Sequence, residues 1–193
     1  SPTRFSALRS LLRLGRTRIS PLLYRPPERT DLIHAFLAHG VLNTREALAI
    51  WNDRRGLTLN DHLGQSLLHF EYLQHVWRHR GNGLFSHTSK QGSRIRYQSC
   101  LPADIRTAAT GIPPIDNAIR ELYRTGRISA RQQGWIASYA VHMRKVDWRV
   151  GAHWMYGHLL TGTLPGVYLE WQRIAGTPGQ SPVVYGSEDM LAD

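Results

Sequence analysis

Histidine and cysteine are the residue types in this chain that could bind a metal ion or act as a nucleophile. His75 and His79 are four residues apart, so on a helix they share one face, a spacing that zinc sites use. No glutamate stands between them in the HExxH order and no third ligand is evident, so we interpret them as helix-surface histidines. The single cysteine, Cys100, excludes a disulfide scaffold and a cysteine-built metal site. A Ser-His-Asp or Cys-His set stays open, although no nucleophile elbow or glycine-rich phosphate loop is present.

Arginine is the residue type through which the chain could bind anions. The 193 residues carry 24 Lys plus Arg against 14 Asp plus Glu, a net charge of +10. Residues 1–30 hold seven arginines and one acid, so they supply +6 of that charge. A strongly basic chain is expected to seek anionic partners. We predict that an arm before Pro26-Pro27 binds a polyanion or a partner through Arg4, Arg9, Arg13, Arg16 and Arg18.

The composition of this arm has three interpretations. Arg-rich, Ser-rich and acid-poor segments are typical of organelle-targeting sequences and of arms that bind polyanions. A weakly ordered leader is the third. No apolar run approaches the roughly 18 residues that span a bilayer, so we expect no membrane span.

The elements that must position these residues are helices. From Thr30 onward the apolar residues recur with helical spacing, and no convincing alternating strand is present. We predict an all-α helical bundle with an arm (1–29), a helical domain (30–176) and an extended, poorly anchored tail (177–193). The predicted helices cover about residues 31–38, 45–51, 57–80, 113–126, 129–145 and 149–161.

Residues 110–176 contain a dense series of motif residues without a gap: Thr110-Gly111, Pro113, Asp116, Ala118, Arg120, Leu122, Thr125-Gly126, Arg131, Ala137-Ser138, Asp147-Trp148-Arg149, Gly151, Leu159, Gly162, Leu164 and Trp171-Gln172. This series resembles the FAD-binding helical domain of the photolyase and cryptochrome family. Shorter matches extend the resemblance over Thr30 to Gly176. The family's N-terminal α/β antenna domain is expected to be absent.

The resemblance implies a flavin pocket, but most of its polar positions are changed. Gln133 and Thr161 stand where the family has a buried Arg–Asp ion pair, so both charges are lost together and neither is left unpaired in a low dielectric. Thr163 replaces a second Asp, Val167 replaces the Asn that faces the flavin, and Ala130 replaces the Asn of the HNR motif. The pocket positions are Ala130, Arg131, Gln133, Gly134, Thr161, Thr163, Val167 and Trp171. From these losses we expect no bound FAD, no metal and no catalytic residue.

The remaining family positions are changed as well. The phosphate loop aligns with Thr30 to His34, where Asp31 would repel a pyrophosphate, or with Thr17 to Pro21. Ser66 and His69 stand where photolyases hold the damaged pyrimidines. Trp148 and Trp171 match two of the family's electron-transfer tryptophans, with Tyr97 in the third place, and buried aromatic packing is the favoured interpretation.

Three functional hypotheses follow. The first is a non-catalytic photolyase-like protein, a structural or accessory subunit of a larger protein or ribonucleoprotein assembly, in an organelle and by preference the mitochondrion. The second is an FAD-binding photolyase/cryptochrome-type flavoprotein with an altered pocket, in DNA repair or light sensing. The third is a sequence-independent nucleic-acid-binding module that contacts RNA or DNA through the arm and the basic face of the domain.

Overall fold

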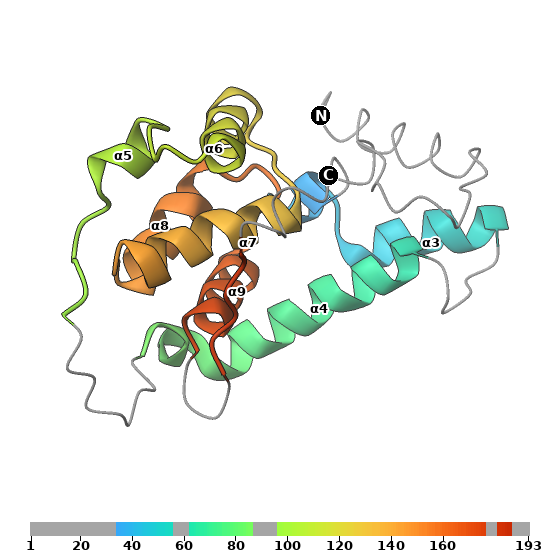
Figure 1. The fold of residues 1–193 in the computed structure, drawn as a ribbon. Coiled ribbons are helices and arrows are strands. Elements are labelled where there is room, and N and C mark those ends of the chain that lie inside the picture. Colours follow the sequence, from blue (N-terminus) through green and yellow to red (C-terminus); the bar gives the residue numbers. More distant parts are fainter. Residues whose placement is uncertain (1–33, 56–61, 87–95, 177–180, 187–193) are drawn as a thin grey trace. The chain divides into compact units, whose positions relative to one another are not determined.

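The structure is a computed structural model that describes residues 34–55, 62–86, 96–176 and 181–186 (Figure 1). The chain forms two compact units, unit 1 (Ser1–His79) and unit 2 (Arg80–Asp193). The described elements are helices, apart from one isolated bridge between Gln98 and Val146, so the all-α prediction is confirmed. The Arg-rich arm and both candidate phosphate loops, except for His34, lie outside the described residues. Within the described part, no helix is both long and apolar enough to cross a bilayer.

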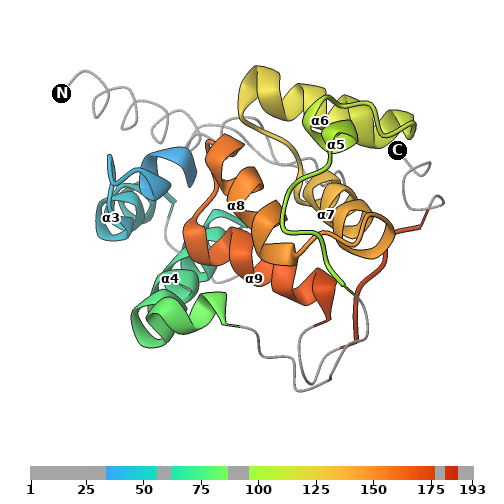
Figure 2. The same cartoon turned by 90° about the vertical axis from the view of Figure 1, so that its left-hand side faces the viewer.

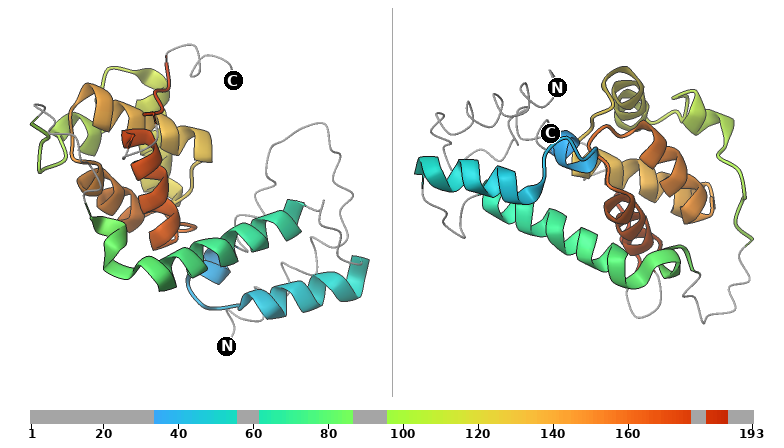
Figure 3. Two further views of the ribbon diagram at one scale, coloured as in Figure 1. Left: turned by 90° about the horizontal axis from the view of Figure 1, so that it is seen from below. Right: turned by 180° about the vertical axis from the view of Figure 1, so that it is seen from behind.

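Unit 1 is built around two long helices, α3 (Thr44–Arg55) and α4 (His62–Arg80), which run beside each other in Figure 3. Asn43 caps the start of α3: its Oδ1 accepts from Glu46 N at 2.8 Å, and Glu46 Oε2 accepts from Asn43 N at 3.1 Å. This reciprocal capping satisfies two backbone donors that a helix start leaves unpaired. A buried apolar cluster holds the unit together and consists of Leu37, Leu42, Ala47 and Leu67.

Unit 2 contains the remaining helices. They are the 3-10 helix η1 (Gly81–Phe85), α5 (Ala103–Arg106), α6 (Pro113–Thr125), α7 (Ala130–Ser138), the π-helical turn η2 (Tyr139–Met143), α8 (Trp148–His158) and α9 (Leu164–Ala175). Figure 2 shows α8 and α9 packed against each other with α7 alongside. The predicted ends of α6 are confirmed: Pro113 begins it, and Gly126 ends it with φ 68°, a conformation that favours glycine.

Three elements of unit 2 were not predicted: η1, α5 and α9. The four-residue α5 is too short to show a helical period. Helix α9 begins with Leu164, Pro165 and Gly166, which conceal a helix start because proline and glycine are poor helix formers. Proline is nevertheless tolerated in a first turn, and Thr163 caps the helix by accepting from Gly166 N at 3.2 Å.

The tail after Gly176 was expected to be poorly anchored, and this is wrong for residues 181–186, which we call the strap. Its backbone is extended, but Val183 N donates to Ile174 O at 3.3 Å and Tyr185 N donates to Ser138 Oγ at 3.1 Å. Nε2 of His142 lies 2.9 Å from Ile174 O and 3.2 Å from Val183 O, so it joins the strap to α9. These partners are far away in the sequence, so no local pattern indicates them.

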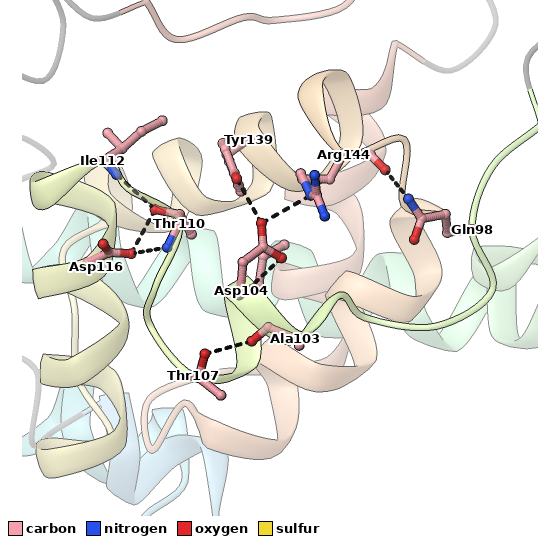
Figure 4. Close-up of polar contacts among 10 residues, drawn as sticks. Gln98, Ala103, Asp104, Thr107, Thr110, Ile112, Asp116, Tyr139 and Arg144 are labelled. Atoms are coloured by element: carbon pink, nitrogen blue, oxygen red, sulfur yellow. Dashed lines mark hydrogen bonds and ion pairs between the residues drawn. The ribbon is translucent and has the colours of Figure 1, made fainter.

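The segment before α5 is hydrogen-bonded to the turn between η2 and α8. Gln98 N donates to Lys145 O at 2.7 Å, and Asp147 N donates to Gln98 O at 2.9 Å. Next to this bridge, Asp104 accepts a hydrogen bond from Tyr139 at 2.9 Å and pairs with Arg144 at 3.1 Å (Figure 4). Burial and the bond to Asp104 raise the pKa of Tyr139, which therefore stays a neutral donor.

Candidate functional site

The first half of α7 carries four of the expected pocket positions. Ser129 caps this helix with a capping box to Gln132, which fixes the direction in which α7 starts. Ala130 is exposed, Arg131 is half-buried with its guanidinium 5.7 Å from the centre of the Trp135 ring, and Gln133 donates to Ile128 O at 3.3 Å. The Gln133 side chain therefore hydrogen-bonds to the backbone just before α7 and not to Thr161.

Gly134, the fourth position on α7, is covered by the strap. A Cβ built on Gly134 would lie 2.6 Å from Cε2 of Tyr185, so any larger residue there would displace this ring. The phenol oxygen of Tyr185 lies 3.4 Å from Nη2 of Arg173, on α9. Gly134 and Tyr185 are in close contact although no sequence pattern connects these two positions.

The other pocket positions lie on α9 and on the turn before it. Thr161 is half-buried, and the hydroxyl of Thr163 is used as the cap of α9. Val167 is 4% exposed and lies near Gly162, on which a built Cβ would be 3.3 Å from Cγ2 of Val167. Two of the residues in the places of the family's flavin contacts, Thr163 and Val167, therefore serve the fold.

The tryptophans that match the electron-transfer positions are core residues. Trp171 is 1% exposed, and its Nε1 donates to Met155 Sδ at 3.3 Å. Its ring occupies the space beside Gly151, on which a built Cβ would lie only 2.0 Å from Cζ3 of Trp171. Trp148 is also buried, whereas Tyr97 is 44% exposed.

Thr110 and Asp116, two of the motif residues, stabilise the turn that leads into α6. Asp116 is buried, and its Oδ1 accepts from both N and Oγ1 of Thr110 at 2.7 Å (Figure 4). Burial by itself raises the pKa of Asp116, but hydrogen bonds from Thr110 and the backbone of Gly111, helped by Arg120, outweigh it and lower the pKa below its ordinary value. Asp116 is therefore ionised at neutral pH and stabilises the turn that starts α6.

Two other candidate sites give no support for metal chemistry. The ring centres of His75 and His79 lie 4.0 Å apart with the ring planes tilted by 38°, and Nδ1 of His79 lies 2.9 Å from His75 O. Among the described residues, no group of three or more His, Cys, Asp or Glu side chains could hold a metal ion.

A hollow of about 860 Å³ in unit 1 contains none of the expected flavin positions; it is lined by Asn43, Thr44, Arg45, Leu48, Ala49, Asn52 and Glu71.

Helix α7 has one feature that fits a ligand and that the sequence did not indicate. Trp135 is 4% exposed, and its Nε1 is a buried donor without an acceptor among the described residues. Buried donors are almost always paired, so an unpaired one points to a missing acceptor. FAD offers many acceptor atoms, and Arg131 supplies a cation next to this ring. On this helix the residues fit an anionic cofactor, whereas Thr163 and Val167 on the α9 side do not reproduce the polar contacts that the resemblance implies.

The expected pocket positions are thus gathered on α7, on α9 and on the turn before α9 of an all-α domain. The comparison with known families identifies it further. The FAD binding domain of DNA photolyase matches residues 55–186, and the chain belongs to this family.

Individual relatives agree with this assignment. A chloroplastic/mitochondrial cryptochrome DASH from Ostreococcus tauri is 35% identical over 102 residues, which are 51% of this chain and 18% of the relative. Among solved structures, the Synechocystis sp. PCC6803 cryptochrome has a TM-score of 0.70 at 20% identity over 97% of this chain, and a photolyase from Sulfolobus tokodaii has 0.69 at 20% identity over 94%. This chain covers 42% of each of these two structures. It thus spans less than half the length of these relatives.

The family assignment overturns the expectation that no FAD is bound. The family is an FAD-binding one, and the Sulfolobus tokodaii structure contains two FAD molecules. The expectation was drawn from the loss of polar side chains at Gln133, Thr161, Thr163 and Val167. A site for a large ligand is made mainly of shape and apolar contact with a few polar groups, so losing side-chain partners does not by itself remove it.

Proposed function

We propose that this chain is an FAD-binding domain of the photolyase/cryptochrome type that acts as an accessory subunit of a larger assembly and carries out no DNA repair of its own. The observation that carries the proposal is the use of expected flavin-contact positions for folding: Thr163 caps α9 and Val167 is part of the core. The frame around them is retained, including the fit of Trp171 against Gly151.

FAD would be held chiefly on α7. Arg131 offers a positive charge and Trp135 a buried N–H donor without a partner among the described residues, and both suit the acceptor atoms of a dinucleotide. An oxidised flavin, when bound, supplies an electron acceptor. Arg131 and Trp135 of this chain would bind and orient it.

The absence of repair activity is proposed from unit 1. Ser66 and His69 replace the family's contacts to damaged pyrimidines, and in α4 Ser66 is half-buried while His69 is exposed. Neither residue offers the carboxylate and indole that the resemblance implies for this purpose.

A direct test is to reconstitute the purified full chain with FAD, remove free flavin, and measure both the blue flavin absorption and light-driven repair of a thymine-dimer oligonucleotide. We expect bound flavin and no repair. A colourless protein after incubation with excess FAD would refute the cofactor part, and dimer repair would refute the accessory part.

The accessory role is proposed together with an anionic partner for the arm. Arg4, Arg9, Arg13, Arg16 and Arg18 would repel one another in solution, so an ordered arrangement needs external anions. Deleting residues 1–25 should reduce co-purification with the assembly, and nuclease treatment distinguishes RNA from an acidic protein surface. Undiminished incorporation of the truncated protein would show that the arm is only a leader.

An organellar location is proposed from two observations. The name of the Ostreococcus tauri relative places that protein in chloroplasts or mitochondria, and residues 1–20 are Arg-rich and acid-free. The mitochondrion is favoured for this chain. Fusion of residues 1–30 to a fluorescent protein tests this directly, and a diffuse signal would contradict it.

A further inference from the structure

One face of α7 carries both the residues suited to FAD and the residues that the strap contacts. Helical residues at spacings i, i+3, i+4 and i+7 share a face, and on α7 this set is Arg131, Gly134, Trp135 and Ser138. The Arg131 guanidinium lies 5.7 Å from the centre of the Trp135 ring, so these two side chains are neighbours. A ligand that contacts both of them therefore has to share this face with whatever lies on Gly134.

The strap occupies this face of α7. The Tyr185 ring lies so close to Gly134 that a Cβ built there would be 2.6 Å from Cε2 of Tyr185. One turn further along, Tyr185 N donates to Ser138 Oγ at 3.1 Å. In Figure 2 the strap, drawn in red beyond α9, runs towards α7. A segment of the same chain thus covers part of the surface that FAD would need.

The unpaired donor on α7 is closed off as well. Trp135 is 4% exposed, and its Nε1 is buried without an acceptor among the described residues. An unpaired buried donor costs free energy, so a state in which Nε1 finds an acceptor would be favoured. An external acceptor can reach Nε1 only after a segment that packs on α7 has moved away.

The strap is the segment on α7 that can be displaced most easily. None of residues 181–186 is buried, whereas α6, α8 and α9 each bury several side chains. Its backbone is held through Tyr185 N on Ser138 Oγ, Val183 N on Ile174 O, and Val183 O beside Nε2 of His142. Segments with few buried contacts are the first to open in a folded protein.

We propose that the strap is a gate over this face of α7: FAD binds when Tyr185 has left Gly134, and the closed strap excludes it. The gate rests on the proposed function, because it requires that FAD contacts Arg131 and Trp135. A protein that binds its ligand only in an open form has an affinity reduced by the fraction that is open. Loosening the strap should therefore tighten FAD binding, and bound FAD should hold the strap open.

Titration of the purified full chain with FAD, followed by flavin fluorescence, tests the effect of the strap on affinity. Tyr185→Ala should tighten binding about ten-fold, which corresponds to a parent strap that is open about one tenth of the time. Tyr185→Phe keeps the ring on Gly134 and should bind within about two-fold of the parent. Val184→Ala is the matched control, because Val184 belongs to the strap but is 62% exposed, and it should also bind like the parent. Circular dichroism confirms that each variant is folded.

Hydrogen exchange followed by mass spectrometry tests the effect of FAD on the strap. In the parent, peptides that cover residues 181–186 should exchange faster with saturating FAD than without it, because Val183 N and Tyr185 N lose their acceptors. In Tyr185→Ala the same peptides should exchange fast in both conditions. A strap that formed a permanent wall of the site would instead exchange more slowly when FAD is bound.

The outcomes separate the gate from the proposed function. The gate alone is overturned if FAD binds Tyr185→Ala no more tightly than Val184→Ala, or if FAD fails to speed exchange in the strap of the parent. Flavin bound by Tyr185→Ala but not by the parent would support the gate. If neither the parent nor any variant binds FAD, the gate and the cofactor part of the proposed function are overturned together.

Discussion

Replacing Gly151 by Ala should destabilise the protein because the new methyl group has no room. A Cβ at this position would lie 2.0 Å from Cζ3 and 2.3 Å from Cη2 of Trp171. The Trp171 ring cannot easily move away, since it is 1% exposed and its Nε1 donates to Met155. Overpacking a core costs about 3 kcal/mol at the upper end of the usual range. Alanine regains about 1 kcal/mol through its higher helix propensity. The net loss is therefore about 2 kcal/mol.

Gly157 provides the control for this substitution within the same helix. A Cβ on Gly157 would have no atom within 4 Å, so Gly157→Ala should keep the propensity gain and raise stability by about 1 kcal/mol. Urea unfolding followed by circular dichroism measures both variants. For a chain of this length, the loss in Gly151→Ala corresponds to a fall in Tm of about 4–8 °C.

A second substitution tests whether the Trp171 ring is the cause. In a Trp171→Phe background the ring is smaller, so Gly151→Ala should cost at least about 1 kcal/mol less than it does with Trp171 present. Equal stability of Gly151→Ala and Gly157→Ala would refute the reasoning, and so would equal costs in the two backgrounds.

Three further substitutions test the site and its frame. Because its folded pKa is lowered, the Asp116 carboxylate stabilises the protein above about pH 4, and this contribution is lost as the pH falls through the folded pKa. Asp116→Asn should therefore cost about 1–2 kcal/mol of stability at pH 7 and flatten the pH dependence of urea unfolding below about pH 4. An unchanged pH dependence below about pH 4 would contradict this. Trp135→Phe removes an unpaired buried donor, so the stability of the flavin-free protein should be unchanged or higher. The same substitution should weaken FAD binding about ten-fold. An unaltered FAD titration would show that Nε1 of Trp135 does not contact the cofactor. Tyr185→Ala should uncover Gly134 and speed proteolysis within residues 181–186, whereas Val184→Ala, at a 62% exposed position, should not; identical cleavage rates would argue against the strap contact.

The sequence predicted those parts of the fold that depend on local rules. The start of α3 at Asn43 and the end of α6 at Gly126 follow from side-chain capping and from the positive φ that glycine tolerates. Helix α9 was missed because Pro165 and Gly166 argue against a helix, and Thr163 was considered only as a lost flavin contact. Its actual role, a cap that accepts from Gly166 N, is a local rule that could have been applied.

The candidate site was harder to predict because it depends on contacts between distant residues. Nothing near Gly134 indicates that Tyr185 covers it, and nothing near Trp135 shows that its N–H lacks an acceptor. The prediction about FAD failed for a related reason. It counted individual polar side chains, whereas the family's cofactor-binding property depends on the whole helical frame.

The strap has a consequence for how unit 2 is made in the cell. Residues 181–186 follow α9 in synthesis, while their partners Ser138, His142 and Ile174 leave the ribosome earlier. Domains fold from the N-terminal side as they are translated, so α7 to α9 can associate before the strap has emerged. During that interval Gly134 is uncovered on the nascent chain. The face of α7 around Gly134 therefore stays open to a chaperone or a small molecule until Tyr185 closes it.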